Sequence, residues 1–196
     1  MGDAREKLLQ AAIQVFSERG FRAASTRDIA RRAKVNPVTL FRLFGGKAPL
    51  HAAVVKHLFA TSKLRAELEN RLAPPLDGPS LIRAAIETIS EAMFQAPASC
   101  RIVLYSVLEG DSRVIRTLWR DLEPIYALLT ENIDGGIRGR RLRRVDSVAA
   151  ARLIVAAAIH HYQVYELYRG KKRPGFGARD LSRHYADIIH HGLEAR

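Results

Sequence analysis

Apolar residues recur every three or four positions along most of the chain, and no segment alternates strictly between apolar and polar residues as a half-buried strand would. This spacing predicts helices that are separated by short segments rich in glycine and proline. The expected helices cover residues 3–19, 25–33, 36–44, 47–72, 80–95, 98–108, 112–133, 146–169 and 178–194. The pattern therefore predicts an all-α fold of about nine helices, with a kink at Pro124.

Residues that favour helix ends bound the first three of these helices. Gly20 follows the first helix as a C′ glycine. Ser25 and Asp28 have the spacing of a capping box at the start of the second helix. Asn36 as N-cap and Pro37 at the first helical position open the third. Two short helices joined by a tight turn predict a helix-turn-helix.

In a helix-turn-helix the second helix enters the major groove of duplex DNA, with its N-terminal residues foremost. Leu40 and Phe44 lie on one face of this helix and can pack against Ile29, which leaves Val38 and Phe41 on the outer side. An ordinary amphipathic hairpin would seldom expose two such residues, whereas a surface that lies against thymine methyls and deoxyribose could use both. The sequence therefore predicts a DNA-reading unit near the N-terminus.

The charge of the chain favours a polyanionic partner. Thirty-two lysines and arginines against twenty acidic residues give a net charge of +12, and residues 1–50 hold ten basic and four acidic side chains. A basic surface attracts polyanions by counterion release, whatever their sequence. Charge by itself therefore fits nucleic acid and an anionic membrane surface alike.

Other chemistry finds little support in the sequence. Cys100 is the only cysteine, so neither an intrachain disulfide nor a thiolate metal cluster is expected. The pairs His160-His161 and His190-His191 are adjacent residues, which point roughly 100° apart on a helix, so no metal site is expected. The chain has no nucleophile signature and no phosphate-binding glycine loop, so we expect no catalytic residues, no enzyme activity and no cofactor. It also lacks a long apolar stretch and a secretory signal, which predicts a cytoplasmic protein without a membrane partner.

The segment from Ser25 to Lys47 resembles the helix-turn-helix of the tetracycline-repressor (TetR) family. The pattern of that family is Thr-x-x-x-Ile-Ala, a Gly-Val turn, Thr-Leu-Tyr-x-x-Phe and then Lys. The residues that stand at these positions are Thr26, Ile29, Ala30, Val35, Thr39, Leu40, Phe41, Phe44 and Lys47, and all but Phe41 match the pattern. The close resemblance covers roughly residues 5–60.

By position, the resemblance implies a set of DNA contacts. Thr26 and Thr39 would hydrogen-bond phosphates, and Arg27 would reach a base edge or a phosphate. Lys47 would hold a phosphate together with the N-terminal amides of its helix. The residues implied to face bases or sugars are Asn36, Pro37, Val38 and Arg42.

Three positions depart from the family pattern. Phe41 stands where tyrosine is usual, so it can keep the ring contact but not the contact of a phenolic hydroxyl with phosphate. Lys34 stands where the turn usually has glycine, and a left-handed backbone there would cost on the order of 1 kcal/mol. Ala48-Pro49 replaces the acidic pair that often follows the lysine.

The resemblance also implies a DNA-binding domain of residues 1–50 and a ligand-binding, dimerising domain of residues 51–196. A pocket for a small-molecule effector would lie among the helices of residues 80–95, 98–108 and 112–133. The candidate lining residues, for each of which an ordinary core position is the commoner role, are Ile89, Met93, Tyr105, Leu108, Trp119 and Tyr126.

The last two expected helices, 146–169 and 178–194, are richer in apolar residues than one small core requires. Two-fold self-association would cover that surface, which predicts a homodimer through these helices. The sequence thus predicts a ligand-responsive repressor that binds a palindromic double-stranded DNA operator. The alternatives are a non-specific DNA-coating or architectural protein and a basic helical protein that docks on anionic membrane.

Overall fold

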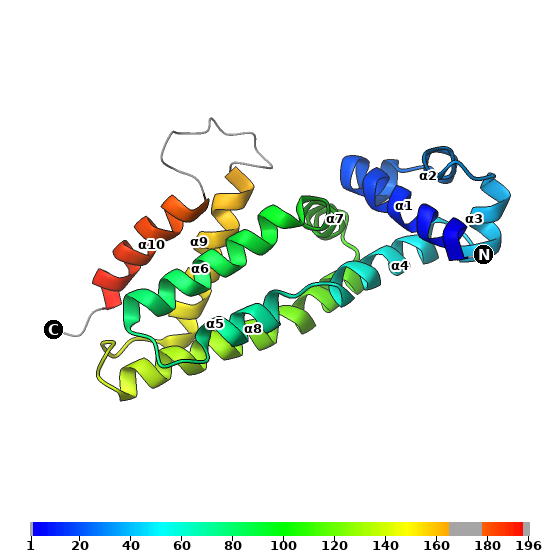
Figure 1. The fold of residues 1–196 in the computed structure, drawn as a ribbon. Coiled ribbons are helices and arrows are strands. Elements are labelled where there is room, and N and C mark those ends of the chain that lie inside the picture. The colour runs from blue at the N-terminus through cyan, green and yellow to red at the C-terminus, as the bar shows by residue number, and fades with distance from the viewer. Residues whose placement is uncertain (1, 165–177, 194–196) are drawn as a thin grey trace. The chain divides into compact units, whose positions relative to one another are not determined.

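The computed structural model describes residues 2–164 and 178–193, and all regular structure within these ranges is helical (Figure 1). The prediction of an all-α fold is confirmed. The helices are α1 (Gly2–Ala23), α2 (Thr26–Ala33), α3 (Pro37–Phe44), α4 (Lys47–Ala60), α5 (Leu64–Leu72), α6 (Gly78–Gln95), α7 (Pro97–Leu108), α8 (Ser112–Arg138), α9 (Ser147–Tyr162) and α10 (Ala178–Leu193).

The single helix predicted over residues 47–72 is wrong, because the chain forms α4 and α5 with a break between them. Thr61 follows α4, and its hydroxyl donates to the carbonyl oxygen of His57 at 2.9 Å. The amide of Ser62 bonds back to Phe59 with the tighter spacing of a turn. Such local hydrogen bonds compete with the backbone hydrogen bonds of the helix. The sequence has no glycine or proline at this position that would have predicted the break.

The end of α8 also differs from the prediction, because the helix continues past residue 133 to Arg138. Gly135 and Gly136 lie inside it. Leu142 packs directly on Gly136, where a Cβ atom would lie 2.8 Å from the leucine Cδ1. Gly136 therefore does not end α8. Its missing side chain leaves room for the segment after α8 to fold back onto the helix. The part of the predicted helix 146–169 that lies beyond residue 164, and residue 194 of the predicted helix 178–194, lie outside the described residues.

The chain forms two compact units, Met1–Ser62 with Ala96–Arg120 and Lys63–Gln95 with Asp121–Arg196. The contacts thus group α4, α7 and the first turns of α8 with the first three helices. The predicted division after residue 50 placed those segments in the second domain. The predicted domains, 1–50 and 51–196, were defined by function, DNA binding and ligand binding, rather than by contacts, so their boundary stays a prediction.

The first unit is built around α1, which packs against α2, α4 and α7. Its core residues come from several helices and include Leu8, Phe16, Ile29, Leu40 and Leu50, each at most 1% exposed. Burial of side chains of this size contributes about 1.5–3 kcal/mol each. The core therefore holds the short helices α2 and α3, which would not be stable alone.

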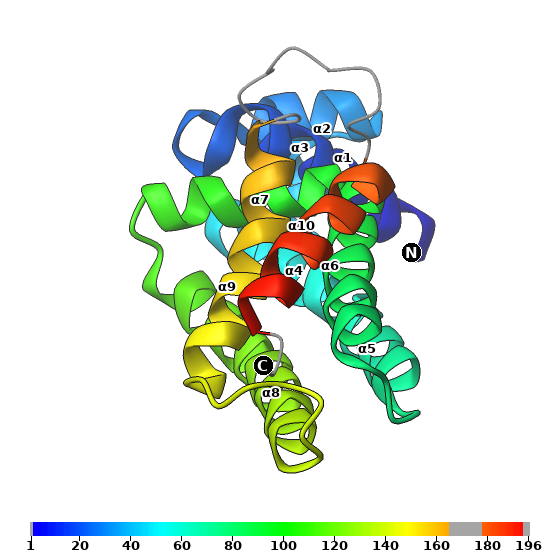
Figure 2. The ribbon, with the colours of Figure 1, turned by 90° about the vertical axis from the view of Figure 1, so that its left-hand side faces the viewer.

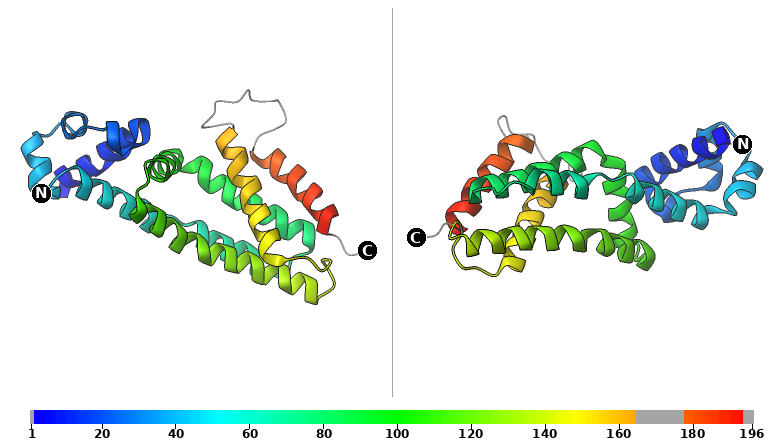
Figure 3. Two further views of the ribbon diagram at one scale, coloured as in Figure 1. Left: turned by 180° about the vertical axis from the view of Figure 1, so that it is seen from behind. Right: turned by 60° about the horizontal axis from the view of Figure 1, so that its bottom comes forward.

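In the second unit α6 packs against both α9 and α10 (Figure 2) and against α5 (Figure 3). Its core contains Leu68, Ile82, Ile86, Leu129 and Ile133. Apolar residues also remain outside this core. Val148 and Leu153 on α9 and Ile188 on α10 are 50%, 53% and 68% exposed.

Candidate DNA-binding site

The expected N-caps are confirmed at both helices of the helix-turn-helix. The Ser25 hydroxyl oxygen accepts a bond from the Asp28 amide at 3.0 Å, and the Asn36 Oδ1 atom accepts one from the Val38 amide at 2.8 Å. The Asp28 carboxylate accepts bonds from the Ser25 hydroxyl and from Arg19. The bond from Ser25 and the nearby arginines lower the pKa of Asp28 below its usual value. These caps fix where α2 and α3 begin.

Lys34 occupies the turn between α2 and α3 in the left-handed conformation, with φ 55° and ψ 42°. The backbone amide of Lys34 donates a hydrogen bond to the carbonyl oxygen of Arg31, and the backbone amide of Val35 donates one to the carbonyl oxygen of Ala30. These two bonds are the pattern that ends a helix on a left-handed residue, a place where glycine is favoured. Because the backbone at Lys34 is left-handed, the cost of a Cβ atom in that conformation applies here.

Replacing Lys34 with glycine is expected to raise the free energy of unfolding by about 1 kcal/mol, because glycine adopts the left-handed conformation without a Cβ penalty. Urea unfolding of the purified protein measures the change. Lys34→Ala is the matched control, since it removes the same charge and keeps the strain. Equal stability of the two variants would contradict this account.

The outer face of α3 carries two exposed apolar side chains, Val38 at 71% and Phe41 at 52%. Leu40 between them is fully buried. The other predicted contact residues lie around the same segment. Asn36, Pro37 and Arg42 are exposed, as is Arg27 on α2, whereas Thr26 and Thr39 are half-buried.

Charge is distributed unevenly over this region. Arg19 and Arg31 form ion pairs with Asp28, and Arg32 pairs with Glu18. Within the described parts of the chain, Arg27 and Arg42 form no ion pair. The positive charges beside the exposed apolar pair are therefore available to an anionic partner.

Lys47 at the start of α4 has a structural role that the sequence did not predict. Its ammonium donates to the carbonyl oxygens of Phe21 and Ala24 at 2.9 Å and of Arg22 at 3.3 Å. It also lies 4.6 Å from the centroid of the Phe21 ring. Lys47 thus ties α4 to the segment that ends α1. Its contact with a DNA phosphate stays a prediction.

The first amides of α4 have no side-chain cap, since Gly46 is the N-cap residue. Backbone amides at such a helix start attract anions. Pro49 lacks an amide hydrogen, so Lys47 and Ala48 supply the donors there.

Further contacts join the end of α1 to α7 and the turn after it, and sequence spacing gives no sign of them. At Gly20, φ is 73°, and a Cβ atom would lie 2.7 Å from the Glu109 carboxylate. This carboxylate accepts a bond from the Arg22 amide at 3.1 Å. The positive φ agrees with the glycine expected after the first helix, and with the extended ψ of 177° it breaks the helical backbone inside α1, which resumes and continues to Ala23.

His51 of α4 is buried between the rings of Phe16 and Phe21 on one side and the turn after α7 on the other. Its Nε2 atom lies 3.5 Å from the Ser106 hydroxyl, and its Nδ1 atom lies 3.8 Å from the Asp111 carboxylate. Burial lowers the pKa of His51 below its usual value, against the opposing effect of Asp111. The ring is therefore neutral at neutral pH and acts as a packing group.

The six predicted effector-site residues are distributed over both compact units. Ile89 is in the core of the second unit, with Met93 and Tyr126 packed against that core. In the first unit Tyr105 lies against Gly20, whereas Leu108 and Trp119 are 73% and 52% exposed. Their role in ligand binding stays a prediction.

Among the described residues, no group of three or more histidine, cysteine or acidic side chains is arranged to hold a metal ion. None of the helices described is both long enough and apolar enough to span a bilayer.

Comparison with known proteins supports the interpretation of the N-terminal region. Residues 8–54 match the family described as bacterial regulatory proteins, tetR family. The HTH-type transcriptional repressor Rv3405c of Mycobacterium tuberculosis is 55% identical over 51 residues, which are 26% of this chain and 27% of that protein. The repressor NicS of Pseudomonas putida is 35% identical over 72 residues, 36% of this chain and 34% of that one. The chain thus spans about a quarter to a third of the length of these relatives.

The fold comparison covers almost the whole chain. A bacterial regulatory protein in the tetR family from Rhodococcus RHA1 has the same fold, with a TM-score of 0.78 over 98% of both chains at 18% sequence identity. The motif between Thr26 and Lys47, the capped helix-turn-helix that it forms and the shared fold lead to one conclusion. Residues 8–54 form a helix-turn-helix region of the tetR family of bacterial regulatory proteins, and the chain as a whole has the fold of the solved tetR-family protein.

Proposed function

We propose that the protein is a sequence-specific DNA-binding transcriptional regulator that reads duplex DNA with α3. The observation that carries the proposal is the outer face of this helix, where Val38 and Phe41 are exposed while Leu40 anchors the helix in the core. A rigid helix with apolar and basic groups on its free face fits the major groove.

The proposed contacts follow the exposed face of the helix-turn-helix. Thr26 and Thr39 bind phosphates through their hydroxyls, and Arg27 binds a base edge or a phosphate. The Asn36 side-chain oxygen is already bonded to the Val38 amide, so its NH₂ group is the part that faces DNA. This group can donate to base acceptors in the major groove, such as O6 or N7 of guanine.

The proposal extends to regulation. Rv3405c and NicS are both named repressors, which supports repression by this chain. A small-molecule effector would weaken DNA binding by favouring the state in which the two reading helices are wrongly spaced. Such a regulator acts on the chromosome in the cytoplasm.

The proposed assembly is a homodimer through α9 and α10, which binds one half of a palindromic operator with each subunit. The exposed Val148, Leu153 and Ile188 supply apolar surface for it. Leu153→Glu is expected to convert the dimer to a monomer in sedimentation velocity and to weaken operator binding about tenfold or more, because each subunit would bury an unpaired carboxylate in an apolar interface. Leu108→Glu, on a similarly exposed leucine of α7, is the control. A Leu153→Glu protein that stays dimeric would contradict this interface.

Selection of bound sites from a random duplex library tests the function. A symmetric consensus supports both the regulator and the dimer. A DNA-coating protein would enrich no sequence, and random duplex would compete fully with any selected site at physiological salt. A membrane-docking protein would bind anionic vesicles equally well as wild type and as Val38→Glu. Either of these results would overturn the proposal.

A further inference from the structure

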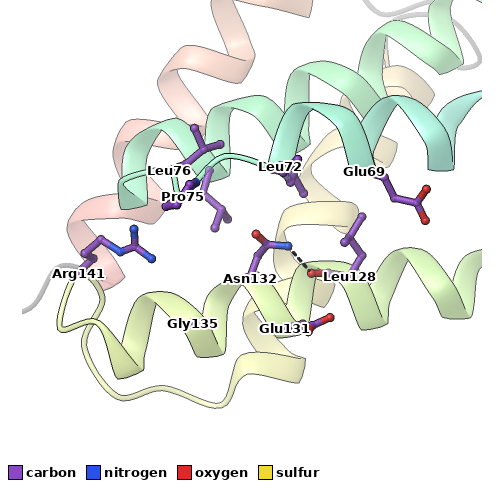
Figure 4. Close-up of a pocket in the computed structure, with 11 residues that line it drawn as sticks. Glu69, Leu72, Pro75, Leu76, Leu128, Glu131, Asn132, Gly135 and Arg141 are labelled. Carbon is purple, nitrogen blue, oxygen red and sulfur yellow. Dashed lines mark hydrogen bonds between the residues drawn. The ribbon is translucent and has the colours of Figure 1, made fainter.

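The second compact unit contains a half-open pocket of about 320 Å³, lined by α5, the segment after it and the C-terminal half of α8 (Figure 4). This volume is near the lower end of the range for small-molecule sites in proteins. The lining residues are Glu69, Leu72, Ala73, Pro75, Leu76, Leu81, Leu128, Glu131, Asn132, Gly135 and Arg141. None of the six effector-site residues predicted from the sequence is among them.

The backbone at one end of the pocket is held rigidly. Arg140 is left-handed with φ 55°, its amide bonds to the carbonyl oxygen of Ile137 at 3.1 Å, and the Arg141 amide bonds to that of Gly136 at 2.9 Å. Leu142 packs on Gly136 immediately afterwards. This is the two-bond helix ending that also occurs at Lys34, and it places Arg141 at a defined position beside the pocket.

The polar groups of the pocket are arranged along its length. Figure 4 shows the Arg141 guanidinium at one end, Asn132 in the middle and Glu69 and Glu131 toward the other end. Asn132 is oriented by a 2.9 Å bond from its amide nitrogen to the Leu128 carbonyl oxygen. Glu69 accepts a bond from Arg65 at 2.7 Å and is therefore neutralised within α5.

Arg141 belongs to a segment that is rich in arginine. Within the described residues Arg141 forms no ion pair, so its five N–H donors are available to a ligand. The neighbouring arginines of the same segment add to the positive potential and are Arg138, Arg140, Arg143 and Arg144. Leu72, Leu76 and Leu128 line the same pocket. An anionic head beside an apolar body matches this arrangement.

We infer that this pocket binds a small amphipathic carboxylic acid. The carboxylate of the ligand pairs with the Arg141 guanidinium, because the planar guanidinium can donate two parallel hydrogen bonds to a carboxylate. The apolar body lies against Leu72, Leu76 and Leu128. The exposed Glu131 at the other end excludes a second carboxylate, which restricts the ligand to monocarboxylic acids. The role of this acid as an effector rests on the proposed function, whereas its binding does not.

Isothermal titration calorimetry with octanoate and 4-phenylbutyrate as probes tests the site on the full-length protein. Both are expected to bind the wild type, and Arg141→Ala is expected to weaken binding about tenfold or more. Arg144→Ala is the matched control, because it removes an exposed arginine from the same segment outside the pocket lining. Ala73→Phe, which fills the pocket from an exposed position, is expected to abolish binding without loss of the core.

Octylamine and octanol have the same apolar chain as octanoate without its carboxylate, so they test the contribution of the charged group. Both are expected to bind more weakly than octanoate. Absence of heat with both acids, or equal affinity of wild type and Arg141→Ala, would overturn the inference. Operator release is measured separately by fluorescence anisotropy. Binding of the acid without release would overturn its effector role alone, whereas failure of the random-library selection would overturn the proposed function and leave the binding site standing.

Discussion

Val38→Glu is expected to lower the affinity for the selected operator by about 100-fold or more while leaving the fold intact. The Val38 side chain is 71% exposed, so its replacement removes no core packing. A carboxylate in the first turn of α3 also interacts favourably with the helix dipole. In the proposed complex, however, the same carboxylate would enter the groove between phosphates, and like charges brought together at an interface cost several kcal/mol.

Fluorescence anisotropy with a labelled operator measures the affinity of Val38→Glu, and a thermal melt measures its stability. Leu108→Glu is a matched control, since Leu108 is 73% exposed and the charge change is the same. It is expected to bind the operator with nearly the affinity of the wild type. If Val38→Glu bound as tightly as Leu108→Glu, α3 would not be the reading helix.

Lys47→Met is expected to lower the free energy of unfolding by about 2 kcal/mol. The ammonium is the shared donor for the carbonyl oxygens of Phe21, Arg22 and Ala24, and loss of a charged donor leaves these oxygens incompletely bonded. Methionine keeps the length and the apolar stem of lysine, so the change isolates the ammonium. Urea unfolding measures the difference.

Lys56→Met is the control for Lys47→Met, because it removes an exposed lysine from the same helix, α4. It is expected to change stability by less than about 0.5 kcal/mol. If the two variants unfolded alike and only Lys47→Met lost DNA affinity, the phosphate contact would be the main role of Lys47. The comparison thus separates the structural role from the predicted one.

The local features of the reading unit could be predicted from the sequence. The caps at Ser25 and Asn36 and the left-handed turn at Lys34 depend on bonds between residues two to five positions apart. The burial of Leu40 and the exposure of Val38 and Phe41 follow from helical periodicity once the core side is known. These features belong to a motif whose residues are close together in the chain.

Features formed between distant segments could not be predicted in this way. The bonds from Lys47 to the end of α1 join residues 23 to 26 positions apart, and the bond of Arg22 to Glu109 spans 87. The helix break after Ala60 and the continuation of α8 across Gly135 and Gly136 went against the sequence signals. No glycine or proline stands at the break after Ala60, whereas the two glycines in α8 predicted an end where the helix continues.

The sequence by itself determined an all-helical chain with a capped helix-turn-helix, because helix periodicity, N-caps and turn residues act over one or two turns. The tertiary structure alone decided that Lys47 bonds to carbonyl groups, that His51 is packed between rings and that Arg141 lies at a pocket. Each of these depends on which helices meet in the folded chain. A charged or polar side chain can have several roles, and the groups brought beside it by folding select one.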